Sequence, residues 1–245
     1  GERHQILREW SGSNVPQDGF RPVHLWVEEQ AARTPSVLAV LDGERRLAYR
    51  ELNRQANRLA YGLARRGVKP EALVGICVER SVEMVVAALA VLKAGGAIVA
   101  LDPAYPWQRL ATIIEDARLA VLLTEEPLLR HFPAHEGIAL CLDRAAAELA
   151  EERSENLVSG VILDNAMYAI YTSGSTGQPK GILVTHRNFA NLIAWQLQDP
   201  SLAALARTVQ FATFGFCVSF QEIFSCWCSG GSLVLASEMT RRDIA

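Results

Sequence analysis

The chain has no surplus of positive charge, because 24 Lys and Arg stand against 27 Asp and Glu and give a net charge of −3. That balance provides no general attraction to nucleic acid or anionic membranes. Its longest apolar run, Met84 to Leu92, ends at Lys93 and is far shorter than the roughly 20 residues that cross a bilayer. The first ten residues contain neither a signal peptide nor an initiator methionine, which suggests a segment of a longer polypeptide. We therefore predict neither nucleic acid nor membrane as a partner.

Cysteine is scarce, with five residues in 245, and the odd number argues against a disulfide framework. Cys77 and Cys141 lie in apolar, strand-like runs, which favours reduced thiols and a cytoplasmic location. The pair Cys226-x-Cys228 has neither the spacing of a C-x-x-C redox motif nor a histidine nearby. The sequence therefore predicts no zinc site.

Half of the chain is apolar, which is enough for a sizeable core. From Val23 onward, helical and strand-like patterns alternate, and the strands are apolar along their length. Such strands are typical of a parallel sheet covered by helices on both faces, so the predicted fold class is α/β. Helices are predicted at 23–32, 49–66, 81–94, 107–117, 145–153, 188–197 and 220–228, and strands at 37–41, 73–78, 97–101, 119–123, 138–142, 167–171, 182–185, 208–212 and 233–235.

Composition also suggests where the chain divides. Residues 1–22 are rich in polar and turn-forming residues and are interpreted as a linker, although an ordinary frayed terminus has the same composition. Residues 154–160 are polar and irregular, and a second alternation of strand and helix follows them. We therefore expect a first α/β subdomain over 23–160 and a second over 161–245.

The stretch from Tyr171 to Gly181 reads Tyr-Thr-Ser-Gly-Ser-Thr-Gly-Gln-Pro-Lys-Gly. Its glycines allow backbone N–H groups to turn inward, its four hydroxyls donate hydrogen bonds, and Lys180 adds a positive charge. This combination predicts a phosphate-binding loop between two strands. It is not the common P-loop, which needs a glycine before the lysine and a hydroxyl after it. A plain surface hairpin is the alternative, although a simple turn does not need four hydroxyls.

Several other residues have structural interpretations that we prefer to functional ones. Tyr49 and Leu52 should pack at the start of a helix, and Lys93 should lie near a helix C-terminus, where the helix dipole favours a cation. His186 is interpreted as a residue at the start of a helix rather than a base. A further three residues, Arg109, Glu115 and Asp116, should lie on the solvated side of a helix.

The stretch from Tyr171 to Gly181 resembles the phosphate-binding signature of adenylate-forming enzymes, which include acyl-CoA ligases, luciferases and the adenylation domains of nonribosomal peptide synthetases. Three other stretches, at 47–53, 92–103 and 214–224, are similar to motifs of the adenylation domains, in the same order along the chain. The resemblance therefore spans nearly the whole chain. It implies the N-terminal core of such a domain, with two stacked α/β subdomains, largely parallel sheets covered by helices, and a linker from a preceding condensation domain.

That resemblance implies activation of a carboxylic acid by ATP and Mg²⁺, which gives an acyl-adenylate that is passed to the phosphopantetheine of a carrier protein, as in natural product biosynthesis. The Mg²⁺ ligand is not identified. The residues assigned to phosphate binding are Thr172, Ser173, Gly174, Ser175, Thr176, Gly177 and Lys180. Those assigned to the acyl pocket are Phe216, Cys217 and Gln221.

At one position the sequence departs from the resembling family. The family's usual Phe-Asp-x-Ser places an aspartate against the substrate's α-ammonium, whereas this chain has Cys217 there, between Phe216 and Val218. Burying an unpaired ammonium costs several kcal/mol, and a neutral thiol does not offset that cost. The expected substrate is therefore an aryl, phenylpropanoid, hydroxy, keto or fatty acid, with a β-amino acid as the alternative.

The family's later motifs, which supply the adenine and ribose contacts, the hinge aspartate and an essential lysine, do not occur before Ala245. We therefore expect the 245-residue chain to fold but not to catalyse adenylation alone. Two alternatives stay open: a catalytically inactive, truncated scaffold, and a fragment of an acyl-CoA ligase. The intact phosphate loop argues against the first alternative, and the linker-like residues 1–22 argue against the second.

Overall fold

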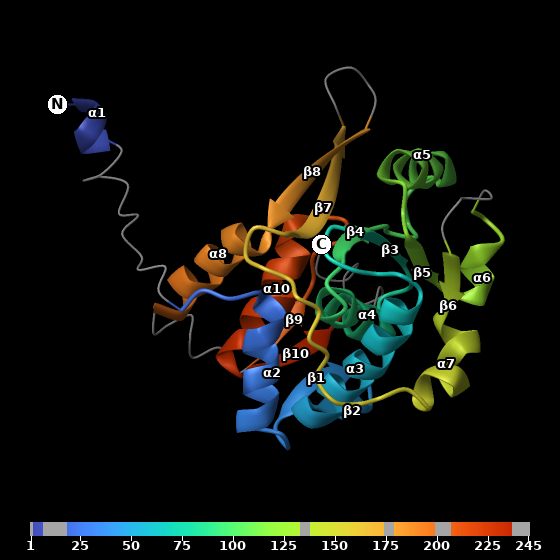
Figure 1. The fold of residues 1–245 in the computed structure, drawn as a ribbon, viewed down its shortest axis with the longest axis horizontal. Helices are drawn as coiled ribbons and strands as arrows, with labels where there is room; N and C mark the ends of the chain where they lie inside the picture. Colours follow the sequence, from blue (N-terminus) through green and yellow to red (C-terminus); the bar gives the residue numbers. More distant parts are fainter. Residues whose placement is uncertain (1, 7–18, 133–137, 174–178, 199–206, 237–245) are drawn as a thin grey trace.

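The computed structural model describes residues 2–6, 19–132, 138–173, 179–198 and 207–236. Its strands form two sheets (Figure 1). The four-stranded sheet has the order β2-β1-β10-β9, with β1 (Leu38–Asp42), β2 (Arg45–Ala48), β9 (Arg207–Gln210) and β10 (Ser232–Leu235). The six-stranded sheet has the order β6-β5-β3-β4-β7-β8, with β3 (Leu73–Cys77), β4 (Ala97–Ala100), β5 (Val121–Thr124), β6 (Ile138–Cys141), β7 (Ala166–Ser173) and β8 (Pro179–Thr185).

Both sheets are mainly parallel, as predicted, and the antiparallel pairs are β1 with β2 and β7 with β8. The described helices are α1 (Glu2–His4), α2 (Val23–Arg33), α3 (Tyr49–Arg65), α4 (Val82–Lys93), α5 (Trp107–Ala117), α6 (Glu126–Leu129), α7 (Leu142–Ala150), α8 (His186–Gln198) and α10 (Cys217–Ser229). None of the helices in the described part of the chain is long and apolar enough to cross a membrane.

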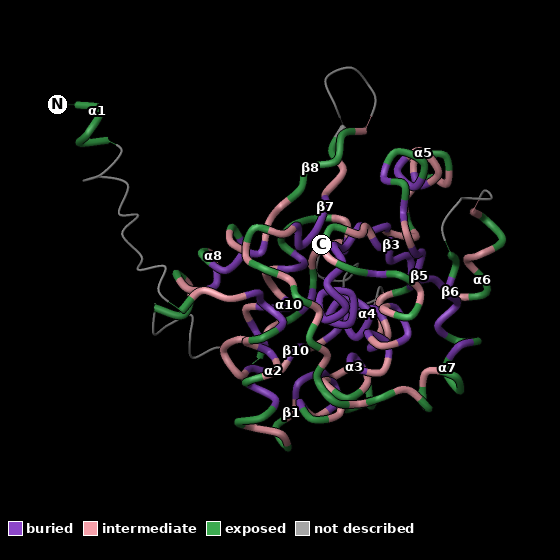
Figure 2. Tube along the Cα trace, in the orientation of Figure 1, coloured by how far each residue is buried: buried purple, intermediate pink, exposed green. Residues whose placement is uncertain are grey.

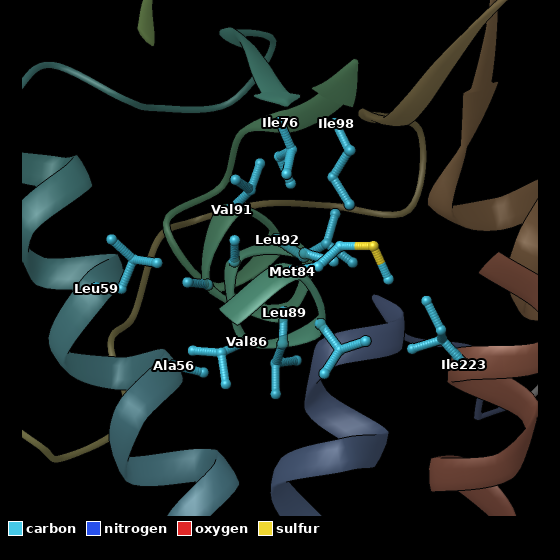
Figure 3. Close-up of a cluster of buried hydrophobic side chains, with 14 of the residues drawn as sticks. Ala56, Leu59, Ile76, Met84, Val86, Leu89, Val91, Leu92, Ile98 and Ile223 are labelled. Carbon is cyan, nitrogen blue, oxygen red and sulfur yellow. The ribbon is translucent and has the colours of Figure 1, made fainter. Parts of the chain in front are cut away.

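The core is organised around α4, in which every residue except Glu83 is buried (Figure 2). A helix that is apolar on all sides has to be surrounded by other elements. Figure 3 shows its side chains between Ile76 and Ile98 of the six-stranded sheet on one side and Ala56 of α3 and Ile223 of α10 on the other. Helices therefore fill the space between the two sheets.

The six-stranded sheet is covered on both faces, which explains its continuously apolar strands. One face packs against the core around α4. The other packs against α5, whose Leu110 and Ile113 contact the layer that contains Val99 and Leu122. The α/β class and the covered, largely parallel sheets are thus confirmed.

The predicted boundary at residue 160 does not separate the two sheets. β1 pairs in parallel with β10, and β4 pairs in parallel with β7, so each sheet contains strands from both sides of that boundary. Sequence spacing could not reveal these pairings, because they join segments far apart in the chain. Of the predicted linker, residues 7–18 lie outside the described residues.

Local signals placed most elements correctly, and the misses have physical causes. The Ser81 side chain accepts a hydrogen bond from the backbone N–H of Met84, as an N-cap should. Tyr49 and Leu52 are fully buried, as expected. The strand β2 was not predicted because its residues begin Arg45-Arg46 and have no apolar alternation, and α6 has only four residues.

Lys93 is the last residue of α4, as predicted, and its side chain is fully buried. There it forms an ion pair with Glu28 of α2. Its ammonium also donates a 3.4 Å hydrogen bond to Oδ1 of Asn156, which accepts further bonds from Asn53 and Asn57 of α3. Burial lowers the pKa of Lys93, and Glu28 opposes that shift. The residue therefore ties α4 to α2 in the core.

His186 is the first residue of α8, as predicted, but it is fully buried beside His24, with the ring centroids 5.9 Å apart. Burial lowers the pKa of His186 from 6.5 to about 4 and that of His24 well below 6.5, with His186 and Lys93 as further causes for His24. Neither ring nitrogen of His186 has a hydrogen-bond partner among the described residues. Both rings are therefore neutral in the folded chain at pH 7.

We expect acid to weaken the fold through this pair. Between pH 6.5 and about 4 the unfolded chain binds more protons than the folded chain, so the free energy of unfolding falls as the pH falls. At pH 5 the loss from His186 alone should be about 2 kcal/mol. Urea unfolding at pH 7 and pH 5 measures it, and in His186→Leu the difference between the two pH values should shrink by that amount. His131 is exposed, so His131→Gln is the control variant. If His131→Gln and His186→Leu lose the same free energy of unfolding between pH 7 and pH 5, buried His186 is not the cause of the acid sensitivity.

Candidate functional site

The predicted phosphate loop joins the two strands of an antiparallel hairpin, β7 and β8 (Figure 1). Thr172 pairs with Lys180, and Tyr171 pairs with Gly181. The strand β8 begins at Pro179, three residues earlier than predicted, which fits the preference of proline for the first residue of a strand. The predicted loop residues Gly174, Ser175, Thr176 and Gly177 lie outside the described residues, and Ser173 ends β7.

Thr172 and Lys180 project from the same face of the hairpin, because residues directly opposite each other in an antiparallel pair share a face. Both are exposed, and no other described residue pairs with the Lys180 ammonium. Alternation along β7 places Thr172 on the same face as Tyr168. A hydroxyl and an ammonium are thus available side by side for an anion at the base of the loop.

The hairpin leaves the carboxyl edge of the six-stranded sheet, where parallel sheets usually bind ligands. Because β4 and β7 are parallel neighbours, the chain that follows β4 reaches the same edge. It carries Tyr105, which precedes α5, and Arg109, whose guanidinium lies 4.5 Å from the centre of the Tyr105 ring. The structure therefore brings α5 beside the hairpin.

Two residues of α5 contact Tyr171: Asp116, which is exposed as predicted, and Arg109, which is half-buried rather than solvated. The Tyr171 hydroxyl donates a 2.7 Å hydrogen bond to Asp116 Oδ2, and Arg109 Nη2 lies 3.5 Å from the Tyr171 carbonyl oxygen. Burial raises the pKa of the Tyr171 hydroxyl, and the bond to Asp116 raises it further. Glu115 is exposed, as expected.

The predicted acyl-pocket residues lie at the start of α10, which begins at Cys217 rather than at residue 220. The sequence signal was missing because the N-cap is Phe216, whose side chain makes no capping hydrogen bond. Phe216 and Cys217 are exposed, and Gln221 is half-buried one turn along the helix from Cys217. Residues four apart on a helix share a face, so the structure brings Cys217 and Gln221 together.

The aromatic side chains of α10 connect this site to the hairpin. The ring of Phe220 stacks on that of Tyr168 in β7, with the centroids 4.4 Å apart. Burial raises the pKa of Tyr168 to about 12, with Cys217 as a further cause. As expected for core aromatics, Phe214, Phe220 and Phe224 are buried, whereas Phe216 is 58% exposed. The first turn of α10, which contains Cys217 and Phe220, therefore packs on the face of β7 that carries Tyr168 and Thr172.

Glu222 on α10 holds the segment that leads into the acyl-pocket residues. Its carboxylate accepts hydrogen bonds from the backbone N–H groups of Phe211 and Ala212, both at 3.1 Å. Arg80 donates to the carbonyl oxygens of Gln210 and Ala212 at 2.8 and 3.1 Å. The backbone before Phe214 is thus fixed by two side chains with opposite charges.

Sequence reasoning missed Tyr105, Asp116, Arg109 and Glu222 as parts of the site. The available signal was positional: Tyr105 follows a buried strand by a few residues, as the phosphate loop does, and the carboxyl ends of parallel strands meet at one edge. In the described residues, no group of three or more His, Cys, Asp or Glu could hold a metal ion.

Comparisons with known proteins identify the family of the chain. The family model described as "AMP-binding enzyme" matches residues 27–245. The chain is 39% identical over 244 residues to tyrocidine synthase 3 of Brevibacillus parabrevis, and 41% identical over 240 residues to the chondramide synthase cmdD of Chondromyces crocatus. It covers only 4% and 6% of those proteins, although 100% and 97% of the chain itself is aligned.

Among solved structures, the chain is similar to the nonribosomal peptide synthetase FmoA3 in its AMPPNP-bound form, with a TM-score of 0.83 and 29% identity over 97% of this chain and 25% of that one. A second form of FmoA3, bound to alpha-methyl-L-serine-AMP, gives a TM-score of 0.78 and 31% identity over 86% of this chain and 23% of that one. The chain therefore belongs to the AMP-binding enzyme family, as part of an adenylation domain of the type found in nonribosomal peptide synthetases.

Proposed function

We propose that this chain forms the phosphate- and acid-binding half of a domain that activates a carboxylic acid with ATP. The supporting observation is that Thr172 and Lys180, paired across the hairpin, lie on the face of β7 against which the first turn of α10 packs through Phe220. Cys217 is the first residue of that turn. A phosphate-binding pair and a candidate acid pocket are therefore neighbours. Such an arrangement suits a reaction that joins an acid to a nucleotide.

In the proposed reaction, an oxygen of the substrate carboxylate attacks the α-phosphorus of ATP. The bond from that phosphorus to the bridging oxygen breaks, and pyrophosphate leaves with the bond's electrons. Thr172 and Lys180, with Ser173 and the loop residues 174–177, stabilise negative charge on the phosphates. We propose that Mg²⁺ arrives with the phosphates of ATP, which is how this ion is commonly held in such sites.

The further partners are also proposals. The acyl group would pass to the phosphopantetheine thiol of a carrier protein, and a condensation domain would precede residues 1–22. All five cysteines are free, which is compatible with the proposed cytoplasmic location.

An inactive scaffold is the alternative function. ATP–pyrophosphate exchange by a protein that carries the complete domain distinguishes the two. Exchange in the presence of an acid supports activation, and a lack of exchange with every tested acid supports the scaffold.

We propose further that the substrate lacks an α-ammonium. Cys217 is the first residue of α10, and the partial positive charge of a helix N-terminus repels a cation. An aspartate there would offset that repulsion, whereas cysteine is in general a far weaker acid. FmoA3 has been solved with alpha-methyl-L-serine-AMP, so the same fold can hold an α-amino acyl group. The proposal therefore depends on the residue at position 217 and not on the fold.

A substrate panel tests this proposal. With the complete domain, we expect kcat/KM for 3-phenylpropanoate and other deamino acids to exceed that for the matching α-amino acids by at least about 10-fold, since an unpaired buried ammonium costs several kcal/mol. Cys217→Asp should shift the preference towards the amino acids, and Cys217→Ser, which restores no charge, should not. A preference of the unmodified protein for α-amino acids that Cys217→Ala abolishes would refute the proposal.

A further inference from the structure

The hairpin extends beyond the sheet that supports it. β7 pairs with β4 only at Tyr168 and Ala169, whereas its pairing with β8 continues to Ser173. From Ile170 onward the hairpin is therefore a two-stranded ribbon that projects from the sheet edge (Figure 1). An isolated two-stranded ribbon is at best marginally stable in water. A ribbon that must present phosphate ligands in fixed positions needs support from another element.

That support comes from α5. In the projecting part of β7, Tyr171 is hydrogen-bonded to Asp116 through its hydroxyl and lies within reach of Arg109 through its carbonyl oxygen. Both partners lie on α5, Arg109 in its first turn and Asp116 next to its last residue. The helix is itself anchored, because Leu110, Ile113 and Ile114 are buried against the sheet. The contacts therefore connect the ribbon to a fixed body.

The small residue opposite Tyr171 makes this contact possible. A Cβ atom added at Gly181 would lie 2.9 Å from Cζ of the Tyr171 ring, closer than real Cβ contacts allow. The far end of the Tyr171 ring therefore lies against Gly181, and its hydroxyl reaches Asp116. The segment before α5 also contacts the segment before the acyl-pocket residues. A Cβ atom added at Gly215 would lie 2.6 Å from the Tyr105 hydroxyl.

We propose that Asp116 and Arg109 are positioning residues that, through Tyr171, hold the projecting hairpin where Thr172 and Lys180 meet the phosphates of ATP. This inference rests on the proposed function for the identity of the ligand. Side chains alternate along β7, so Tyr171 faces α5 and its neighbour Thr172 faces the opposite side, where α10 packs on Tyr168 through Phe220. The contacts of Tyr171 with α5 on one face of the strand therefore fix the orientation of the opposite face, which carries Thr172.

The first arm of the test needs no nucleotide. In a protein with the complete domain, Tyr171→Phe and Asp116→Ala should each speed amide hydrogen exchange in 170–173 and 179–182 by roughly 3- to 10-fold, as expected for loss of a partly exposed, charge-assisted hydrogen bond. Exchange in β3 and β5 should not change. Glu115→Ala is the matched control, because it removes a neighbouring exposed carboxylate of α5 that forms no hydrogen bond with the described part of the hairpin. Unchanged exchange in both variants would overturn the inference.

The second arm is kinetic. Tyr171→Phe and Asp116→Ala should raise KM for ATP by roughly 3- to 10-fold and leave kcat and KM for the acid within about 2-fold. Asp116→Asn keeps an oxygen that accepts from Tyr171 and should restore most of the affinity. The double variant should be no worse than either single one, since both remove one bond. Gly181→Ala should have an effect similar to that of Asp116→Ala, because the added Cβ would push the far end of the Tyr171 ring out of its place beside Asp116.

The outcomes separate the role of α5 from the proposed function. If kcat and both KM values change together while the melting temperature falls, the contacts are merely structural and the inference is wrong. If none of the tested acids supports ATP–pyrophosphate exchange by the unmodified protein, the proposed function is wrong. Amide hydrogen exchange then still decides whether α5 holds the hairpin. If exchange rates rise in the hairpin and KM for ATP alone rises, both stand.

Discussion

Replacing Glu28 with glutamine should destabilise the fold by about 3–5 kcal/mol, because it removes one partner of a buried ion pair and keeps the size of the side chain. Lys93, the other partner, has a fully buried side chain, and that of Glu28 is 11% exposed. The amide oxygen of glutamine could still accept a hydrogen bond from the ammonium, as Asn156 does at 3.4 Å, but the buried charge would have no countercharge. Losing its proton at pH 7 limits the penalty to about 5 kcal/mol, the cost of moving from pKa 10.5 to neutral pH. Equilibrium unfolding in urea measures the loss.

The control lies next to it in the sequence. Glu29→Gln removes a carboxylate that pairs with Arg21 at the surface, where the two side chains are 58% and 42% exposed, so its effect should stay within about 1 kcal/mol. Equal effects of Glu28→Gln and Glu29→Gln would show that the buried pair adds no more than an exposed one. The double variant Glu28→Gln with Lys93→Met should regain much of the lost stability, because no charge is left unpaired.

The pH dependence provides a second check on the same pair. Burial lowers the pKa of Lys93 in the folded chain, so between that value and about 10.5 the unfolded chain binds more protons. The free energy of unfolding therefore rises with pH over that window, and it should rise more in Glu28→Gln, where nothing opposes the effect of burial. The gap between the variant and the unmodified chain should narrow towards pH 10. If the difference in the free energy of unfolding does not change with pH, the destabilisation in Glu28→Gln does not come from the unpaired Lys93 ammonium.

Local patterns were enough to predict the elements, because their signals lie within one helix or strand. The apolar run at α4, the Ser81 cap and the glycine-rich loop between two strands are all of this kind. They also placed Cys217 and Gln221 on one segment. The resemblance of four motifs to adenylation domains then identified the family, which the comparisons confirmed.

Contacts between distant segments could not be predicted in this way. The sequence places Lys93 at a helix end and Asp116 on the solvated side of a helix, but it does not reveal their partners. Those come from the packing of α4 on α2 and of α5 on the hairpin. The parallel pairing of β1 with β10 likewise joins residues that are nearly two hundred positions apart in the chain, such as Val40 and Leu233. Side-chain periodicity indicates which face is buried but not which element covers it.

Lys180→Ala should lower kcat/KM for ATP by roughly 10- to 100-fold in a protein that carries the complete domain, the effect of losing one charge-assisted phosphate contact of about 1.5–3 kcal/mol. The side chain is exposed, and no described residue pairs with its ammonium, so the free energy of unfolding should change by less than about 0.5 kcal/mol. The measurement is ATP–pyrophosphate exchange as a function of ATP concentration, together with urea unfolding of the same variant.

Lysine is rare in this chain and occurs only at Lys69, Lys93 and Lys180, which makes a matched control simple. Lys69→Ala also removes one exposed ammonium, but from the turn before β3, and should leave the ATP kinetics unchanged. Lys180→Arg keeps the charge and should recover part of the rate, though not all, because a planar guanidinium replaces a compact ammonium. If Lys180→Ala unfolds the protein while the folded fraction keeps normal ATP kinetics, the hairpin is structural and the phosphate assignment is wrong. If Lys69→Ala and Lys180→Ala slow the reaction equally, the effect comes from the net charge of the protein. Lys180 then does not bind the phosphates of ATP directly.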